Sequence, residues 1–207
     1  ILEGERRRWT VALLFGLWAR RAEIARLSMA DFTFSQSTRR WSVQLLRKGG
    51  KHDRLPLADW VMDALVRYRQ ALGMPPLPSD QEGSISAIGR LRTSAQRERK
   101  PLSPEVLYRD VAKTGARAAQ HLRQGEILAD MGPLERESLA ATLEALSPHW
   151  FRHSGASIAI NTGAMTLENA SKMLGHADPS MTAAMYYHRS DAQLSDGIQT
   201  LGAKLFR

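Results

Sequence analysis

The run SPHWFRH at residues 147–153 is the stretch from which the fold and chemistry of this chain can be worked out. It opens with serine followed by proline, the pattern of an N-cap before the first helical residue, so a helix is predicted to begin at residue 148. On that helix His149, Arg152 and His153 fall at positions i, i+3 and i+4, which places them on one face. A fixed cation beside two imidazoles predicts an anion site that can also handle a proton.

Two other interpretations of the same run stay open at this point. Taken alone, a basic helix start is more often a solvated surface than a site. Metal binding by His149 and His153 is the second interpretation. It is disfavoured because Trp150 stands where a zinc-protease helix carries glutamate, and because Arg152 would repel a cation.

Related residue types recur in four short segments elsewhere in the chain. Arg20 lies three residues before Glu23, and the run KGGK occupies residues 48–51. The run LGH stands at 174–176 and YYH at 186–188. Each is ordinary alone, because ion pairs and charged hairpin tips are common on protein surfaces. Their order along the chain carries more information than any one of them.

Composition limits the classes of protein to consider. The chain has 207 residues, a formal net charge of +8, 43% hydrophobic residues and no cysteine. These values predict a globular domain rather than a disordered chain, and they exclude disulfides, thiolate metal sites and cysteine nucleophiles. Residues 9–19, the longest uncharged apolar stretch, are too short for a bilayer span of about 20 residues. No signal peptide is evident, so we expect a cytoplasmic protein whose positive charge meets a polyanion.

Apolar periodicity predicts a mainly helical chain with one small three-stranded antiparallel sheet, an α+β fold. Residues 5–27 read as two helices or one bent helix, with Gly16 as a candidate soft spot. The alternation of Trp41, Val43 and Leu45 with their neighbours predicts a strand with one packed face, and the Gly49-Gly50 pair predicts a tight hairpin turn. The strands are expected at 32–34, 41–46 and 54–57, and the later helices at 59–72, 104–121, 134–146, from 148, 166–174 and from 179.

Two further segments complete the prediction. Residues 74–89, which contain Pro75-Pro76 and Gly83, read as a surface loop. Residues 190–207 are predicted to form a tail helix with an amphipathic stripe. The stripe consists of Leu194, Ile198, Leu201 and Leu205.

The order of these motifs resembles the catalytic domain of the tyrosine recombinases, the phage-integrase family, over nearly the whole chain. The run ARRAEI at 19–24 is similar to the family's first-arginine box, and RKGGKHDRLPL at 47–57 to its lysine hairpin. HWFRH at 149–153 matches the His-x-x-Arg box, and 174–176 the segment that holds the third-position histidine. The run YYH at 186–188 gives the Tyr-x-His spacing ten residues after Gly-His.

The resemblance implies a role for each matching residue. Arg20 and Arg152 would grip the scissile phosphate, Lys48 would protonate the leaving oxygen, and Tyr186 would be the nucleophile. His149 would relay a proton and His176 would bond a phosphate oxygen, with Glu23 and His153 in supporting roles.

The chain departs from the family pattern at two places, and each departure leaves a second candidate residue for one role. Trp18 replaces a common glycine, which makes Arg21 a rival to Arg20. Tyr187 is a rival to Tyr186, and because a one-residue step turns a helical side chain by about 100°, only one of them can face the phosphate; register with His176 and His188 favours Tyr186.

The resemblance also implies an activity and partners. It implies a site-specific recombinase that cleaves and rejoins double-stranded DNA through a 3′-phosphotyrosyl intermediate, without ATP, metal or another cofactor. Within DNA enzymes a type IB topoisomerase is the alternative, and a non-catalytic DNA-binding protein on the same scaffold is the alternative from another class. Candidate contacts to the DNA backbone are Lys51, Arg54, Arg90, Arg92, Arg97, Arg99 and Lys100.

Expectations about assembly follow from the same resemblance. The chain opens at Ile1 without an initiator methionine, and we interpret residues 1–207 as a single catalytic domain that lacks its N-terminal DNA-clamping domain. The full-length protein is expected to act as a homotetramer on paired DNA sites, and the fragment to be monomeric, away from any membrane and associated with a bacterial or phage nucleoid. The tail at 190–207 would pack on its own domain or on a neighbouring protomer.

Overall fold

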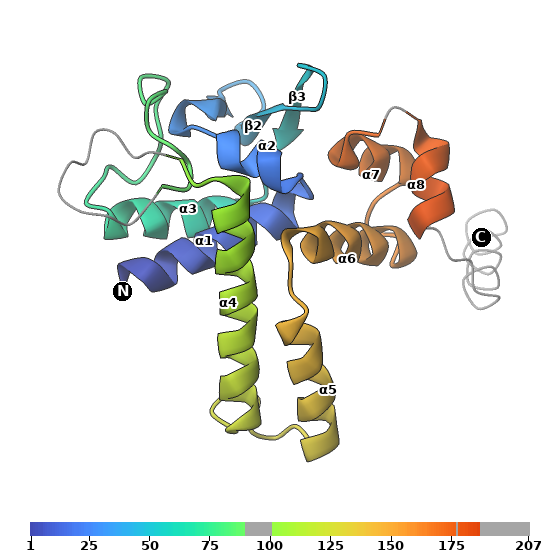
Figure 1. The fold of residues 1–207 in the computed structure, drawn as a ribbon. Coiled ribbons are helices and arrows are strands. Elements are labelled where there is room, and N and C mark those ends of the chain that lie inside the picture. The colour runs from blue at the N-terminus through green and yellow to red at the C-terminus, as the bar shows by residue number, and fades with distance from the viewer. Residues whose placement is uncertain (90–100, 177, 187–207) are drawn as a thin grey trace, which may run out of the picture. The chain divides into compact units, whose positions relative to one another are not determined.

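The computed structural model describes residues 1–89, 101–176 and 178–186 (Figure 1). It divides into two compact units, residues 1–155 (unit 1) and 156–207 (unit 2). The boundary lies inside helix α6, Pro148–Asn161. The predicted fold class is confirmed, because helices predominate and the strands form one small antiparallel sheet.

The N-terminal segment forms two helices rather than one bent helix. Helix α1 runs over Leu2–Leu17 and helix α2 over Arg21–Arg26. The break lies at Trp18, whose φ of 48° is left-handed, and not at Gly16. Gly16 stays helical and allows a close contact, because a Cβ there would lie 2.6 Å from the Val61 side chain.

The predicted meander is confirmed, with slightly shifted ends. After a short 3-10 turn, η1 at Met29–Asp31, the strands β1 (Phe32–Ser35), β2 (Arg40–Leu46) and β3 (His52–Pro56) pair antiparallel in that order. Val43, Leu45 and Leu55 are fully buried, so the predicted alternation is correct. The turn between β2 and β3 uses two positive φ angles, 84° at Gly49 and 80° at Gly50.

The core of unit 1 lies between α1, the sheet and α3, which spans Asp59–Ala71 (Figure 1). Trp9, Leu65 and Phe32 are buried there, and the Trp9 and Phe32 rings lie 5.8 Å apart. Helix α3 ends at the predicted glycine, because Gly73 has a φ of 69°. This core carries α2 and the β2–β3 hairpin on its surface, and both contribute predicted site residues.

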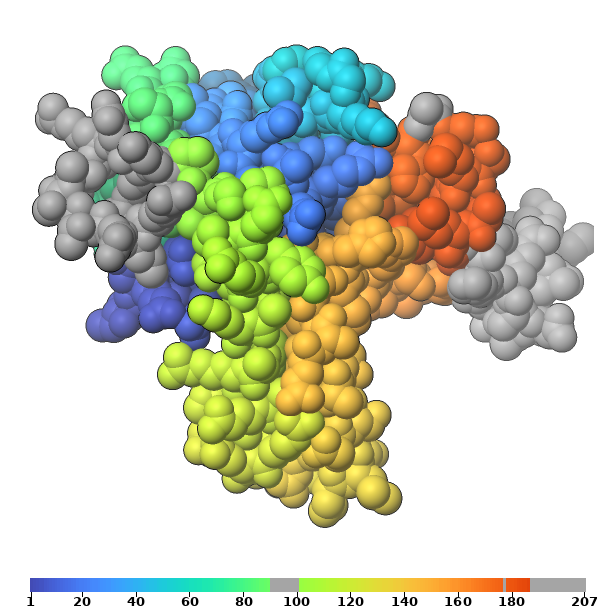
Figure 2. Space-filling view, viewed as in Figure 1, coloured from blue at the N-terminus to red at the C-terminus, as the bar shows by residue number. Residues whose placement is uncertain are grey.

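Helices α4 (Pro104–Arg123) and α5 (Pro133–Glu144) form an antiparallel pair that stands out from the rest of unit 1 (Figure 2). The predicted N-cap is confirmed, because Ser103 Oγ accepts the Val106 N–H at 3.3 Å. Gly115 sets how closely the helices approach, since a Cβ there would lie only 2.1 Å from the Leu143 carbonyl oxygen. Both helices deviate by two residues from their predicted C-terminal ends.

The last predicted helices are also present. Ser147 Oγ accepts the Trp150 N–H at 3.1 Å, which caps α6 as expected. In unit 2, α7 spans Leu167–Leu174 and α8 spans Pro179–Tyr186. The predicted stripe within 190–207 lies outside the described residues. Among the residues that are described, no helix combines the length and apolarity needed to cross a bilayer.

The prediction of a surface loop at 74–89 is wrong for its second half. Backbone hydrogen bonds join Met29 N–H to Ile85 O and Ala87 N–H to Leu27 O, each at 2.8 Å. The Trp9 indole N–H also donates to Ala87 O at 2.8 Å, and Ala87 is fully buried. Pairing with a segment far away in sequence, which local composition does not encode, draws this half into the core.

The first half of the loop is held by a buried arginine. Arg69 of α3 is 0% exposed and donates to Pro75 O at 2.7 Å and to Leu77 O at 2.9 Å. Its two terminal nitrogens bind both carboxylate oxygens of Glu82, at 2.8 and 2.9 Å. Burial by itself raises the pKa of Glu82, but hydrogen bonds from Arg69 and the Ser79 N–H, with the Arg69 charge, hold it below its usual value.

The pair between Arg69 and Glu82 makes a stability prediction. Glu82→Gln keeps the shape but leaves a buried guanidinium without its counter-charge, so it should lower the free energy of unfolding by about 2–3 kcal/mol near neutral pH. Because the folded pKa of Glu82 is lowered, its contribution is present above the unfolded pKa and is lost as pH falls through the folded value. The variant should therefore lose less stability on acidification than the parent.

Denaturant unfolding followed by tryptophan fluorescence reports on unit 1, because all five tryptophans lie in residues 1–155. Glu137→Gln is the matched control, since Glu137 pairs with Arg123 on an exposed surface and such pairs contribute little. Equal midpoints for Glu82→Gln and Glu137→Gln would contradict a stabilising role for the buried pair.

Candidate functional site

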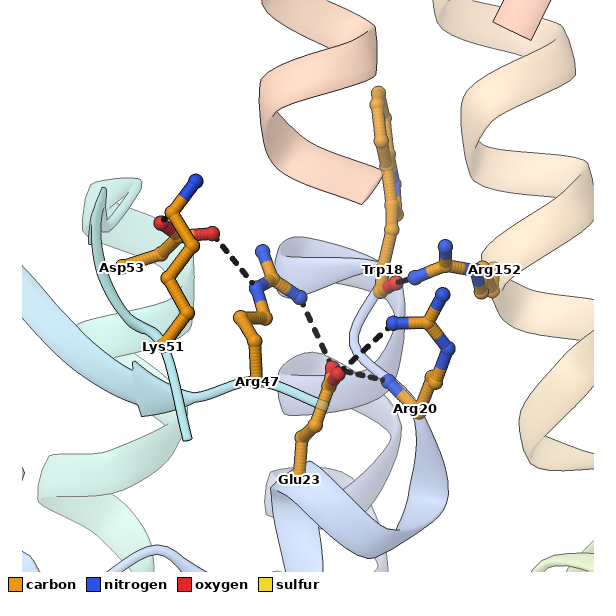
Figure 3. A network of polar contacts seen from close by, with 7 residues as sticks. All are labelled: Trp18, Arg20, Glu23, Arg47, Lys51, Asp53 and Arg152. Atoms are coloured by element: carbon orange, nitrogen blue, oxygen red, sulfur yellow. Dashed lines mark hydrogen bonds and ion pairs between the residues drawn. The ribbon is translucent and has the colours of Figure 1, made fainter. Parts of the chain in front are cut away.

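Two buried opposite charges meet where α2 faces the β2–β3 hairpin (Figure 3). Glu23 is 5% exposed and Arg47 is 4% exposed. Arg47 Nη1 donates to Glu23 Oε2 at 2.9 Å, and Arg47 Nε donates to Asp53 Oδ2 at 3.1 Å. One guanidinium therefore joins α2 to the first residues of β3.

Glu23 also fixes Arg20, the predicted first catalytic arginine. The Arg20 backbone N–H donates to Glu23 Oε2 at 2.8 Å, and Arg20 Nη1 donates to Oε1 at 3.0 Å. The Arg20 side chain is 42% exposed, so it can meet a ligand while the carboxylate holds it. These two contacts hold the Arg20 backbone and side chain, and the sequence predicts a supporting role for Glu23.

Arg152, the second predicted arginine, is held by the connection between α1 and α2, which also leads to Arg20. Its side chain is 5% exposed, and Nη1 donates to the Trp18 carbonyl oxygen at 2.5 Å (Figure 3). Trp18 lies two residues before Arg20 in the short connection between α1 and α2. This connection therefore carries one arginine and anchors the other, which brings together two motifs far apart in the sequence.

The Trp18 carbonyl is in place because of an unusual backbone and a close helix contact. Trp18 has a φ of 48°, a left-handed conformation that costs free energy for a residue with a side chain. Its indole lies against Gly155 of α6, where a Cβ would be 2.2 Å from the indole nitrogen. Only glycine at 155 leaves room for the ring, so the indole contact offsets the backbone strain.

A surface groove of unit 1 lies between α2 and the tip of the β2–β3 hairpin. Lys48 is exposed at the hairpin tip and lines this groove together with Arg20. The predicted lysine and the first predicted arginine therefore share one depression. Charged side chains around it are Arg20, Glu23, Arg26, Arg47 and Lys48.

The two predicted histidines of α6 lie against each other. The Nε2 atoms of His149 and His153 are in contact, and the ring centroids are 3.9 Å apart. Burial lowers the pKa of His153 below its usual value, and the nearby His149 and Arg152 lower it further because they disfavour a second positive charge. His153 therefore favours the neutral form, which suits a supporting hydrogen-bonding role.

In unit 2 the remaining predicted residues have defined partners. His176 Nδ1 and Thr182 Oγ1 are 2.8 Å apart, which ties the end of α7 to α8. Tyr186 is 3% exposed, and its backbone carbonyl accepts a hydrogen bond from Asn161 Nδ2 at 3.1 Å. Tyr187, its predicted rival, lies outside the described residues.

The predicted DNA-backbone contacts are only partly described. Lys51 is 77% exposed, with its ammonium 3.7 Å from Asp53 Oδ1, and Arg54 is exposed on β3. The other five lie in the segment 90–100, outside the described residues. Within the described part of the chain, no three histidine or acidic side chains are grouped as metal ligands would be.

Sequence reasoning missed three features of this site: Arg47, Asp53 and the Trp18 carbonyl. For the first two a signal existed. Arg47 continues the inward phase of Val43 and Leu45, and Asp53 shares the phase of the buried Leu55, since side chains two residues apart point to the same face. Two opposite charges in inward phase predict a buried pair. No comparable signal marks the Trp18 carbonyl.

Comparison with known proteins gives a consistent result. Residues 3–193 match the family model described as the phage integrase family. Among curated proteins, the chain is 28% identical over 185 residues to a tyrosine recombinase XerC of Anoxybacillus flavithermus, covering 89% of this chain and 50% of that protein. The chain thus spans about half the length of this relative.

Solved structures with a similar fold include recombinases and a transposon integrase. XerH recombinase bound to its difH substrate has a TM-score of 0.57 at 17% identity, covering 98% of this chain and 47% of that chain. XerA recombinase gives 0.56 at 17%, with coverages of 96% and 59%. The Tn1549 integrase in complex with transposon right-end DNA gives 0.54 at 15%, with coverages of 95% and 59%. At these identities the likeness shows the fold alone.

The contact between Trp18 and Gly155 is open to a double-mutant test. Gly155→Ala forces the indole away and should lower the free energy of unfolding by about 1–3 kcal/mol, the usual cost of overpacking. In a Trp18→Gly background the same alanine meets no ring, so its cost should disappear. Denaturant unfolding of the four proteins measures the coupling, and additive effects would contradict the proposed contact.

The environment of His153 makes a pH prediction. The folded pKa lies below 6.5, so the unfolded chain binds more protons as pH falls through 6.5, and stability falls with it until the folded pKa is passed. His149→Gln removes one neighbouring positive charge and should raise the pKa of His153. Titration of the His153 ring signals by NMR measures its pKa in the parent protein and in the variant. A His153 that titrates above 6.5 in the parent protein would contradict the described environment.

Proposed function

Because this chain belongs to the phage integrase family, we propose that it is the catalytic region of a site-specific DNA recombinase. The observation that carries the proposal is the arrangement of cations in unit 1. Arg20 and Lys48 line one groove, and the connection that carries Arg20 also anchors Arg152. The curated relative named above, a tyrosine recombinase, supports the same activity class, and the structural neighbours support the shared fold.

Cleavage of a DNA phosphodiester is favoured by cations held close together. Its negative charge repels a nucleophile, and the transition state places more charge on the non-bridging oxygens. Two guanidiniums bind such oxygens in a planar, bidentate manner, and fixed positive charge supplies most of the catalysis that phosphoryl transfer requires. In the proposal Arg20 and Arg152 bind the scissile phosphate, and His176 donates a hydrogen bond to one of its oxygens.

The proposed reaction is a reversible transesterification. The Tyr186 Oη attacks phosphorus, a bond from phosphorus to Oη forms, and the bond from phosphorus to the 5′ oxygen breaks. The tyrosine proton passes to His149, and Lys48 donates a proton to the departing 5′ oxygen. The 3′-phosphotyrosyl link is itself a phosphodiester and conserves the free energy of the bond that was broken. In the proposal, rejoining therefore needs neither ATP nor a metal ion. Tyr186 is 3% exposed, so we expect DNA binding to bring its hydroxyl out to the phosphate.

The proposed partner is double-stranded DNA, which matches a formal net charge of +8. Lys51 and Arg54 are proposed to contact the backbone near the hairpin. We propose further that the full-length protein works as a homotetramer on paired sites, as the family resemblance implies. In that assembly, residues 190–207 would dock either on their own protomer or on a neighbouring one.

The proposal predicts a covalent protein–DNA adduct. We would incubate the purified protein with a pool of nicked duplexes taken from the DNA around its own gene, since a nick lets the cleaved strand dissociate and traps the intermediate. An SDS-resistant, protease-sensitive adduct is expected, with Tyr186 in the DNA-linked peptide identified by mass spectrometry. Tyr186→Phe should abolish the adduct, because it removes the attacking oxygen.

Tyr187→Phe is the matched control, and it should leave the adduct intact. Loss of the adduct with Tyr187→Phe alone would move the nucleophile by one residue. Absence of an adduct with the parent protein, despite measurable DNA binding, would contradict the recombinase proposal and favour a non-catalytic scaffold. Relaxation of supercoiled DNA without strand exchange would favour a type IB topoisomerase.

A further inference from the structure

We propose that Arg47 is a positioning residue that holds Lys48 at the phosphate groove, an inference that rests on the proposed function. Arg47 directly precedes Lys48, and the family resemblance implies no role for it. Its guanidinium is buried between α2 and β3 (Figure 3). Lys48 is exposed at the hairpin tip. The two neighbours therefore divide the work: one anchors the hairpin and the other meets the substrate.

The side chain of Arg47 links the hairpin to the element that holds Arg20. Nη1 donates to Glu23 Oε2 at 2.9 Å, and the same oxygen accepts the Arg20 backbone N–H at 2.8 Å. Nε donates to Asp53 Oδ2 at 3.1 Å on the other arm of the hairpin. The Glu23 carboxylate and the Arg47 guanidinium thus link the segment that carries Arg20 to the hairpin that carries Lys48.

The backbone of Arg47 fixes the turn that carries Lys48. Its N–H donates to Lys51 O at 2.7 Å, and its carbonyl oxygen accepts the Gly50 N–H at 3.2 Å. Gly49 and Gly50 complete the turn with positive φ angles. Because glycines impose little stiffness by themselves, the direction of the Lys48 side chain depends on how firmly residue 47 is anchored.

Only arginine fits this position. A guanidinium offers separate N–H donors in a rigid plane, which lets one residue bind Glu23 and Asp53 from different edges. Lysine would keep the charge as a single point on a flexible chain and could satisfy one carboxylate well. Arg47→Lys should therefore retain the fold and lose much of the positioning, which separates geometry from charge.

Positioning of a general acid has a chemical signature that a structural ion pair lacks. Lys48 matters because the 5′ oxygen leaves as an alcohol and needs a proton. If sulfur replaces that oxygen, the bond from phosphorus to sulfur breaks and a thiolate departs, which needs no proton because thiols are far more acidic than alcohols. A defect that arises through Lys48 should disappear on the sulfur substrate, and a defect in phosphate binding should remain.

The test compares single-turnover cleavage of one nicked duplex, selected from the pool above and made with oxygen or sulfur at the scissile 5′ position. Arg47→Met and Arg47→Lys should each cleave the oxygen substrate at least about tenfold more slowly than the parent and the sulfur substrate at nearly the parent rate. Lys48→Ala should show the same pattern, and Arg20→Ala should be slow on both. Arg40→Met, the same change at the exposed far end of β2, should match the parent on both.

An equal loss on both substrates, or no loss on the oxygen substrate, would overturn the inference. A parent protein that forms no adduct on either substrate fails the proposed function itself. Hydrogen exchange of the DNA-free protein separates these cases, because it needs no activity: Arg47→Met should speed exchange of the Gly50 amide at least about tenfold, whereas Arg40→Met should not. Unchanged exchange at Gly50 would show that Arg47 does not hold the turn.

Discussion

The buried carboxylate of Glu23 is the constraint on which the described part of the site depends. A carboxylate that is 5% exposed requires cations and donors, and it receives them from the Arg20 N–H, the Arg20 side chain and Arg47. Satisfying one buried charge therefore fixes the start of α2 and the hairpin at the same time. The exposed cations of the groove, Arg20 and Lys48, therefore extend from two elements that are joined at this carboxylate.

The second arginine depends on a different device, a backbone carbonyl in a strained segment. Trp18 adopts a left-handed conformation and presents its carbonyl to Arg152, while its indole occupies the space that Gly155 leaves on α6. Backbone strain that is offset by tertiary packing is typical of functional sites. Trp18 stands where many members of the family have glycine, and it still adopts the left-handed turn because Gly155 leaves space for its indole.

Elements with local causes could be predicted from the sequence. The Ser-Pro starts of α4 and α6 and the Gly49-Gly50 turn follow from the conformations those residues favour, and the contact between His149 and His153 follows from helix spacing. Features that depend on distant partners could not be predicted: the burial of Ala87 requires pairing with Leu27, and the break at Trp18 is packed against Gly155. The inward phase of Arg47 lies between these cases, because the strand pattern indicated burial without naming the partner.

A crystal structure of the protein covalently joined to a nicked duplex would test the account most directly. Guanidinium nitrogens of Arg20 and Arg152 are expected about 2.7–3.2 Å from non-bridging oxygens of the phosphate linked to Tyr186. Lys48 is expected to face the position of the 5′ oxygen while Arg47 remains between Glu23 and Asp53. A phosphate bound away from Arg20, or an Arg47 that leaves Glu23 to bind the DNA, would contradict it.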